Sequence, residues 1–198
     1  MPVAFVTELT VGAGDTIKLY SYDASPAGTT MDYDVDWGDS SSDSNVTTAD
    51  KTHTYSSAGT YQVVITNQFG SLNMQRASAT ERSYLRNMVQ WGTDNIWSSL
   101  YRMFYGCDLM EYTATDFPNL TNMVERSEIR EMFFQCDSVV NLDLSNWTNT
   151  SNITYAYQAF SYTEGLKTIN LTGWDVSNIT YAYNFCYYAG DLVDGCEF

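Results

Sequence analysis

The seven-residue phrase SNITYAY occurs twice in this chain, at residues 151–157 and again at residues 177–183. Self-similarity at a period of about 20–50 residues is the signature of solenoid proteins, in which each repeat buries its apolar face only against its neighbours. Such folds present broad surfaces and usually lack an enclosed pocket. The repeat therefore favours a binding or scaffolding role over catalysis.

Other residues recur at nearly the same spacing. Trp147 and Trp174 are 27 residues apart. Phenylalanines recur at spacings of 29, 27 and 25, as Phe104, Phe133, Phe160 and Phe185. The alternating runs VVNLDL, from Val139, and LKTINL, from Leu166, place every second side chain on one face of a strand. We expect about four coils between roughly residue 90 and the C-terminus, each with a strand, a loop and a short helix.

The first 70 or so residues have a different pattern. Alternating runs occur at VAFVTELTV, TIKLYSY, MDYDVDW and TYQVVIT, separated by clusters of Gly, Ser, Asp and Pro. Short strands at this spacing indicate a β-sandwich. The sequence therefore predicts a β-rich chain in which residues 1–72 form a sandwich, residues 73–90 are a linker and first-coil entry, and residues 91–198 form the solenoid.

The sandwich segment resembles a PKD-type Ig-like domain. The resemblance is carried by VDWGDS at residues 35–40 and by HTYSSAGTYQVVITN at residues 53–67, although Ser40 replaces the last glycine of the turn. It implies an extracellular or surface-exposed spacer or adhesion module, with no catalysis.

The charge balance excludes some classes of partner. The chain has 24 acidic and 9 basic residues and a formal net charge of −15. Nucleic-acid binding requires a basic stripe, and adsorption to anionic membranes requires basic clusters, so we expect neither. No segment has the length of a membrane span, and MPVAFVTELTVGAGD has no basic region or apolar core of a secretory signal. Cationic partners suit this charge.

Carboxylates and cysteines are the candidate metal-binding or reactive groups. Asp34, Asp36 and Asp39 are candidate Ca²⁺ ligands, but turn capping and a solvated acidic face explain them more simply. The cysteine spacing fits neither a zinc site nor a CxxC redox motif. Cys107 and Cys136 occupy equivalent repeat positions and are expected to be buried thiols. Cys186 and Cys196 are candidates for a disulfide that would close the C-terminal end, which sequence alone does not decide.

No motif indicates catalysis or a cofactor. The sequence has no GxSxG nucleophile elbow, no GxGxxG or GxxxxGK[ST] phosphate loop, and one histidine, His53. We expect no cofactor and no enzymatic activity, and we expect His53 to be a structural hydrogen-bonding group.

The repeats resemble those of the BspA-type leucine-rich-repeat surface proteins. The resemblance is carried by the MF-x-x-C segments at Cys107 and Cys136, by NLDLSNW at residues 141–147, by WDVSNIT at residues 174–180 and by QWGTDNIW at residues 90–97. It implies a leucine-rich-repeat-like solenoid and binding to host proteins or surfaces. Members occur on bacterial and protist surfaces and in phage genomes.

This chain departs from that pattern where tyrosine pairs replace the Met-rich helix. These tyrosines either pack partly into the core or form a contact surface: Tyr155, Tyr157, Tyr181 and Tyr183. The last coil is also expected to contact another subunit or a particle surface, through Phe185, Tyr187, Tyr188 and Phe198.

The combined pattern favours a non-enzymatic phage virion protein, an exposed capsid decoration or fibre-type subunit. Its expected partners are other virion proteins or a host-surface ligand within an oligomer or larger assembly, and its expected location is the virion surface. The alternative is a secreted bacterial adhesin at the cell surface. A carbohydrate-active enzyme is a third hypothesis, for which the sequence offers no site.

Overall fold

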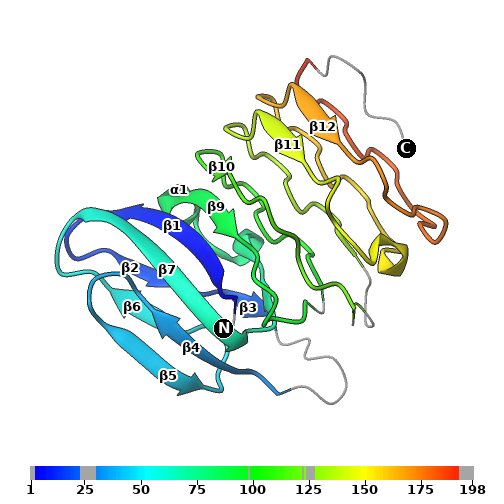
Figure 1. Ribbon diagram of the computed structural model, residues 1–198. Helices are drawn as coiled ribbons and strands as arrows, with labels where there is room; N and C mark the ends of the chain where they lie inside the picture. Colours follow the sequence, from blue (N-terminus) through cyan, green and yellow to red (C-terminus); the bar gives the residue numbers. More distant parts are fainter. Residues whose placement is uncertain (1–2, 23–29, 98, 122, 124–127, 192–198) are drawn as a thin grey trace.

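The computed structural model describes residues 3–22, 30–97, 99–121, 123 and 128–191 (Figure 1). The chain is β-rich, as the alternating runs predicted. In the described residues helix is confined to α1 (Ala79–Tyr84) and two 3₁₀ turns, η1 (Met74–Arg76) and η2 (Thr150–Asn152). The strands are β1 (Phe5–Val11), β2 (Thr16–Lys18), β3 (Ser21–Tyr22), β4 (Asp32–Asp36), β5 (Ser42–Val46), β6 (Thr52–Thr54), β7 (Gly59–Gln68), β8 (Ser71–Leu72), β9 (Leu85–Gln90), β10 (Glu111–Tyr112), β11 (Asn141–Asp143) and β12 (Thr168–Asn170).

Six strands form one sheet in the order β10-β9-β1-β7-β4-β5. β1 lies antiparallel to β7, with Phe5 opposite Ile65 and Val11 opposite Gly59. Every second residue of β1 is buried, beginning with Phe5, because alternate side chains of a strand point to opposite faces of the sheet. The alternation in the sequence thus gives a sheet with one buried face.

Two small antiparallel sheets, β2–β6 and β3–β8, accompany the large sheet. Apolar residues of both kinds of sheet, such as Leu9 and Val63 of the large sheet and Ile17 of β2, line one internal cavity of about 40 Å³. The small sheets therefore pack on the inner face of the large one, and they leave little empty space between the layers.

The stretch 73–90, expected to be a linker and first-coil entry, contains η1, α1 and β9. Ser78 caps α1 by accepting a hydrogen bond from the Glu81 amide at 3.2 Å, and the Glu81 carboxylate accepts one from the Ser78 amide at 2.8 Å. β9 then pairs antiparallel with β1, and β10 pairs parallel with β9. The large sheet therefore continues across the expected domain boundary. We call residues 3–90 the sheet region and residues 91–191 the repeat region.

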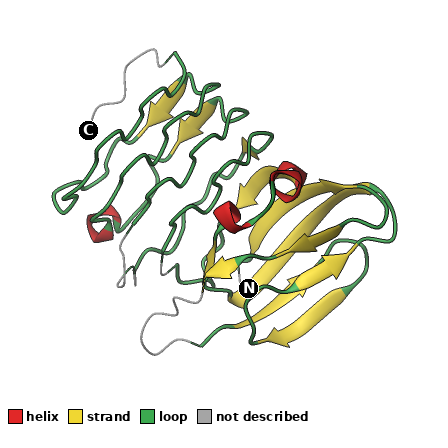
Figure 2. Cartoon of the chain, turned by 180° about the vertical axis from the view of Figure 1, so that it is seen from behind, coloured by secondary structure: helices red, strands yellow, loops and turns green. Residues whose placement is uncertain are grey.

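The repeat region consists of successive turns of chain that lie side by side (Figures 1 and 2). β11 and β12 come from the two predicted strand segments, and they pair in parallel with Asn141 opposite Thr168. The recurring phenylalanines form a column, in which the ring centroids of successive members lie 5.3, 5.5 and 5.0 Å apart. The predicted stacking of Phe104, Phe133, Phe160 and Phe185 is confirmed.

The short helix expected in each coil is wrong. Its residues form hydrogen-bonded turns, because a residue with positive φ recurs at each equivalent position: Arg102, Glu131, Gln158 and Asn184, with φ of 54°, 52°, 51° and 56°. A left-handed residue interrupts the i→i−4 hydrogen bonds of an α-helix. The amides bond to the next coil instead, as the Phe104 amide does to the Met132 carbonyl at 2.9 Å.

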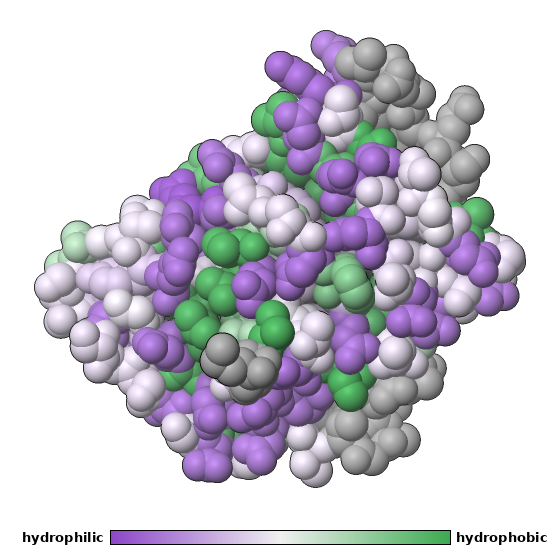
Figure 3. Space-filling view, viewed as in Figure 1, coloured by the Kyte–Doolittle hydropathy of each residue, from purple (hydrophilic) through white to green (hydrophobic). Residues whose placement is uncertain are grey.

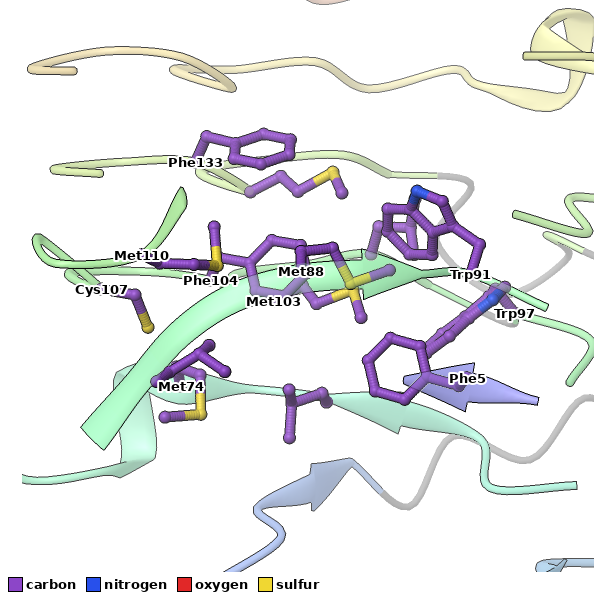
Figure 4. Packing of buried hydrophobic residues seen from close by; sticks show 14 of the residues in the cluster. Phe5, Met74, Met88, Trp91, Trp97, Met103, Phe104, Cys107, Met110 and Phe133 are labelled. Carbon is purple, nitrogen blue, oxygen red and sulfur yellow. The ribbon is translucent and has the colours of Figure 1, made fainter. Parts of the chain in front are cut away.

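One hydrophobic cluster includes residues of both regions. At the junction the ring centroid of Phe5 lies 5.2 Å from that of Trp97 and 6.3 Å from that of Trp91 (Figure 4). Trp91 also contacts Trp147, at 5.4 Å, and Trp147 stacks on Trp174 at 5.5 Å. The tryptophans that recur in the sequence thus connect the sheet region to the repeat region.

Candidate binding surface

The tyrosine pairs form two columns along the side of the repeat region. The rings of Tyr155 and Tyr181 stack with centroids 4.8 Å apart and planes 14° apart. Those of Tyr157 and Tyr183 lie 6.2 Å apart at 13°. A parallel bridge between Tyr155 and Tyr181 sets this register. The repeat places equivalent residues of neighbouring coils directly above one another, so a tyrosine repeated in sequence becomes a stack of tyrosines.

A further aromatic column was not predicted from the sequence. Tyr105 stacks on Phe134, with centroids 4.8 Å apart and planes 6° apart, and Phe134 contacts Tyr162 at 5.2 Å. Tyr162 then contacts Tyr187 at 5.8 Å and Tyr188 at 5.6 Å. These residues follow the phenylalanine positions by one to three residues, and the recurrence of an aromatic residue just after each phenylalanine is the signal that would have identified them.

The aromatic rings become more exposed toward the C-terminal coil. Tyr155 and Tyr157 are half-buried. The last coil contains the exposed members, Tyr181, Tyr183, Tyr187 and Tyr188, whose exposed fractions are 43%, 63%, 45% and 67%. We call the two tyrosine columns and the column from Tyr105 to Tyr188 the aromatic surface. The face shown in Figure 3 has apolar patches scattered among hydrophilic side chains.

Arginine side chains lie beside the early part of the aromatic surface. The guanidinium of Arg130 lies 4.3 Å from the ring centroid of Tyr101 and 5.7 Å from that of Tyr155. Arg102 lies 4.6 Å from the Tyr101 ring and forms two hydrogen bonds to Glu131, at 2.6 and 3.1 Å. Burial raises the pKa of Tyr101, so this ring stays a neutral phenol at physiological pH. The surface therefore combines aromatic rings with cations that are held by neighbouring carboxylates.

The predicted assembly contacts have different environments. Phe185 is not a surface residue, because it is only 7% exposed and packs against Phe160. Tyr187 and Tyr188 are exposed, as a contact role requires. Phe198 lies outside the described residues. Cys186 is disulfide-bonded, and Cys196 lies outside the described residues, so the identity of the Cys186 partner stays a prediction.

The acidic residues of β4 and its following turn are occupied by local hydrogen bonds. Asp34 accepts from the Asn45 amide at 2.8 Å, and Asp36 accepts from the Gly38 amide at 2.9 Å. Asp39 accepts from the Ser41 amide at 3.0 Å. Within the described part of the chain, no group of three or more His, Cys, Asp or Glu side chains is placed to hold a metal ion. The structure does not bring the three candidate calcium ligands together.

His53 lies against this turn. Its Nε2 is 2.9 Å from Asp39 Oδ2, and its ring stacks on Trp37 at 4.8 Å. Tyr55 contacts the edge of the imidazole and donates from its hydroxyl to the Trp37 carbonyl at 3.0 Å. His53 is thus hydrogen-bonded and packed within the sheet region, as expected.

The two cysteines of the repeat are buried free thiols, as predicted. Burial raises the pKa of the Cys107 thiol, and it raises that of Cys136 well above its usual range. Both side chains are therefore protonated at neutral pH and lack the thiolate character of a nucleophile.

Two open grooves of about 280 and 290 Å³ also occur, and both are lined mainly by polar residues. One lies between the segment around Tyr112 and the segment around Val140. The other lies beside α1 and is lined by Arg82, Asp108 and Asp137. In the residues that are described, no helix is long and apolar enough to cross a membrane.

A family model described as "Mycoplasma protein of unknown function, DUF285" matches residues 72–194, which is more than half of the chain. No curated protein and no solved structure gives a significant match. The matched segment begins in β8 and includes α1, β9 and the repeat region. It therefore includes all residues of the aromatic surface.

Proposed function

The chain belongs to the DUF285 family, and we propose that it is a non-enzymatic structural protein of a phage virion that binds its partners through the aromatic surface. The single observation that carries the binding role is the set of four exposed tyrosines on the last coil, continuous with the stacked rings of the earlier coils. Tyrosine supplies a large contact area with few rotatable bonds, so little conformational entropy is lost on binding.

We infer that the repeat region is a leucine-rich-repeat-like solenoid of four coils. The four residues with positive φ support it, since they recur at spacings close to those of the phenylalanine column. A stack of this kind gives a rigid surface that repeats with the coils. We also infer that the sheet region is a PKD-type Ig-like sandwich, with the Trp37–Asp39 turn as its signature.

The virion role, as a capsid decoration or fibre-type subunit, rests on the resemblance of the two parts to surface-exposed modules. A secreted BspA-type adhesin on a bacterial surface is the alternative, and the same resemblance favours it. Other virion proteins or a host-surface ligand are the proposed partners. The lack of thiolate character at Cys107 and Cys136 supports a non-enzymatic role for the repeat region.

Electron microscopy tests the location. Antibodies against the purified chain, carried on gold particles, are applied to phage particles and to cells from the source culture. Labelling of capsids or tails supports the virion role, and labelling of the bacterial surface supports the adhesin alternative. Labelling of neither contradicts both proposals.

Reattachment tests the aromatic surface. Purified chain is added to particles produced without its gene, and the bound amount is measured by quantitative gel electrophoresis. We expect the double variant Tyr183→Ser, Tyr188→Ser to lose at least about tenfold in binding, because it removes two exposed aromatic anchors. Leu109→Ser is the matched control, because Leu109 is 41% exposed but lies outside the aromatic surface. Equal binding of both variants would contradict the assignment of the surface.

A further inference from the structure

Along residues 100–106 and their equivalents in later coils, backbone hydrogen bonds form continuous chains, in which every amide donates to the following coil. The Arg102 amide donates to the Arg130 carbonyl at 3.0 Å. The amide of the same peptide group, that of Glu131, donates to the Tyr157 carbonyl, also at 3.0 Å. The Gln158 amide then donates to the Tyr183 carbonyl at 3.1 Å. Each peptide group accepts from the preceding coil and donates to the following one.

Three parallel chains repeat this pattern, beginning at the amides of Leu100, Phe104 and Gly106. Each of their coil-to-coil bonds is between 2.7 and 3.2 Å long. The cause is the left-handed backbone, which recurs at a second set of equivalent positions, Gly106, Gln135, Tyr162 and Tyr188. Alternating right- and left-handed residues point every second amide to the same side, so the dipoles of these peptide groups add along the stack.

The last coil presents the donor end of these chains. The amides of Ala182, Asn184 and Tyr188 have no acceptor within the described part of the chain. The equivalent amides one coil earlier, those of Ala156, Gln158 and Tyr162, all donate to this last coil. Three open backbone donors thus lie at the edge of the last coil.

This edge also lacks the usual protection against pairing. Proteins commonly place charged residues on an open strand edge to prevent association. Residues 177–190 contain no charged side chain, in a chain with 33 charged residues (24 acidic and 9 basic). Exposed rings, among them Tyr183 and Tyr188, flank the open amides. The edge is therefore suited to pairing with another segment.

The direction of the donors restricts what can pair there. A second copy turned to face this edge presents donors to donors, and so does not fit. The first coil of a second copy does not fit either, because that end of the stack bonds to the sheet region, where the Met74 amide donates to the Arg102 carbonyl at 3.1 Å. At these three amides the occupant must supply acceptors.

We propose that this edge binds an extended, uncharged polypeptide segment of another protein, which supplies a row of backbone carbonyls and aromatic side chains. The template is the last coil itself, whose carbonyls at Tyr181, Tyr183 and Tyr187 accept from the preceding coil at 2.8, 3.1 and 2.8 Å. Such pairing adds a strand to an open edge, with main-chain hydrogen bonds giving affinity and the tyrosine columns giving specificity. The proposal rests on the proposed function only in taking the partner to be a protein.

Amide hydrogen exchange of the full chain, followed by NMR, tests whether the edge is open. We expect the Ala182, Asn184 and Tyr188 amides to exchange at least about a hundredfold faster than those of Ala156, Gln158 and Tyr162, whose hydrogen bonds must first open. Slow exchange at all concentrations would overturn the proposal, because the edge is then covered by the chain's own residues. Slow exchange only at high concentration would assign the edge to self-association and overturn it as well.

Binding is tested with a peptide that copies residues 177–189, with serine at the position of Cys186 and both ends blocked. Titrated into the full chain, it is expected to shift the three open amides and to slow their exchange at least about tenfold. Tyr183→Asp places a charge at the edge and is expected to weaken this binding about tenfold. Thr172→Asp is the matched control, with the same charge change at an exposed position of the same coil.

Protection of the Gln158 amide reports that the variants are folded. Absence of shifts at the three amides with millimolar peptide, in a chain that keeps this protection, overturns the proposal. This result leaves the location of the protein untouched, because the gold-labelling experiment decides that separately.

Discussion

The sheet region and the repeat region are stabilised by contacts over different distances in the sequence. β1 pairs with β7, 48–60 residues later, and with β9, about 80 residues later. In the repeat region each coil bonds mainly to the next, through residues 22–32 positions apart. Contacts of the first kind form only when the whole sheet forms, whereas contacts of the second kind add up from neighbour to neighbour. The difference predicts all-or-none unfolding of the sheet region and a graded response in the repeat region.

Phe133→Ala tests this difference with the largest expected effect. Phe133 is fully buried between Phe104 and Phe160, and truncating a buried phenylalanine typically costs about 3–5 kcal/mol of unfolding free energy. Urea denaturation measures the loss, with Leu109→Ala as the exposed control, expected to change stability by less than about 0.5 kcal/mol.

Hydrogen exchange on the Phe133→Ala variant then localises the damage. We expect protection to fall in the repeat region while Val63 of β7 keeps its protection. A uniform loss of protection in both regions would contradict this difference, because it would show that the two regions unfold as a single cooperative unit.

Gly92→Ala tests the junction between the two regions. Gly92 has φ of 69°, and an added Cβ would lie 2.1 Å from the Val3 carbonyl oxygen. The left-handed conformation costs a non-glycine residue about 1–2 kcal/mol, and overpacking adds about 1–3 kcal/mol. Gly14 is the matched control, because its φ is 85° but no atom lies within 4 Å of the added Cβ.

Thermal unfolding of both glycine variants measures the difference. Gly14→Ala is expected to show only the conformational cost, and Gly92→Ala the sum of both costs. Equal losses would show that the backbone of residues 3–4 moves freely, and that the junction does not couple the two regions.

The sequence predicted the repeat better than it predicted the backbone within each coil. The doubled SNITYAY gave the correct register, since the Thr180 amide bonds to the Thr154 carbonyl 26 positions earlier. The turns were missed because Glu131 and Gln158 have positive φ, which side chains with a Cβ rarely adopt. Nothing in these residue types indicates such a conformation, and their helix propensity points the other way.

The joining of the two regions was missed for a different reason. The run LRNMVQ of β9 has no clean alternation, since only Leu85 and Met88 are buried. A β-strand with irregular burial next to a capped helix resembles a linker in sequence. The proposed binding surface was predicted from the sequence in part, because Tyr155 and Tyr157 lie within the repeated phrase, whereas Tyr105 and Phe134 lie outside it.

Acid is expected to destabilise the sheet region through Asp39 and Asp43. A hydrogen bond from Ser41 lowers the pKa of Asp39, with His53 contributing, and hydrogen bonds from Lys51 and Trp37 lower that of Asp43. A carboxylate whose folded pKa lies below its unfolded pKa stabilises the fold fully above the unfolded value. That stabilisation is lost as the pH falls through the folded pKa.

Urea midpoints between pH 6 and pH 2 measure this effect, and the decrease is expected below about pH 4. Asp43→Asn is expected to lower stability at pH 6 and to flatten the decrease. In the repeat region Asp143 accepts hydrogen bonds from the amide and the hydroxyl of Ser145. Asp143→Asn should therefore alter the dependence of stability on pH less than Asp43→Asn does. An unchanged profile in Asp43→Asn would remove this distinction between the regions.

The smallest expected effect compares one tyrosine hydroxyl from each region. Tyr55 is fully buried, and its hydroxyl donates to the Trp37 carbonyl at 3.0 Å, so Tyr55→Phe should cost about 0.5–1.5 kcal/mol. Tyr183 is 63% exposed, and its ring contacts are kept by phenylalanine, so Tyr183→Phe should be neutral within about 0.5 kcal/mol. Urea denaturation checks both values. A clear loss of stability in Tyr183→Phe would mean that its hydroxyl has a structural role, and the exposed tyrosines would then be part of the fold rather than a surface available to a partner.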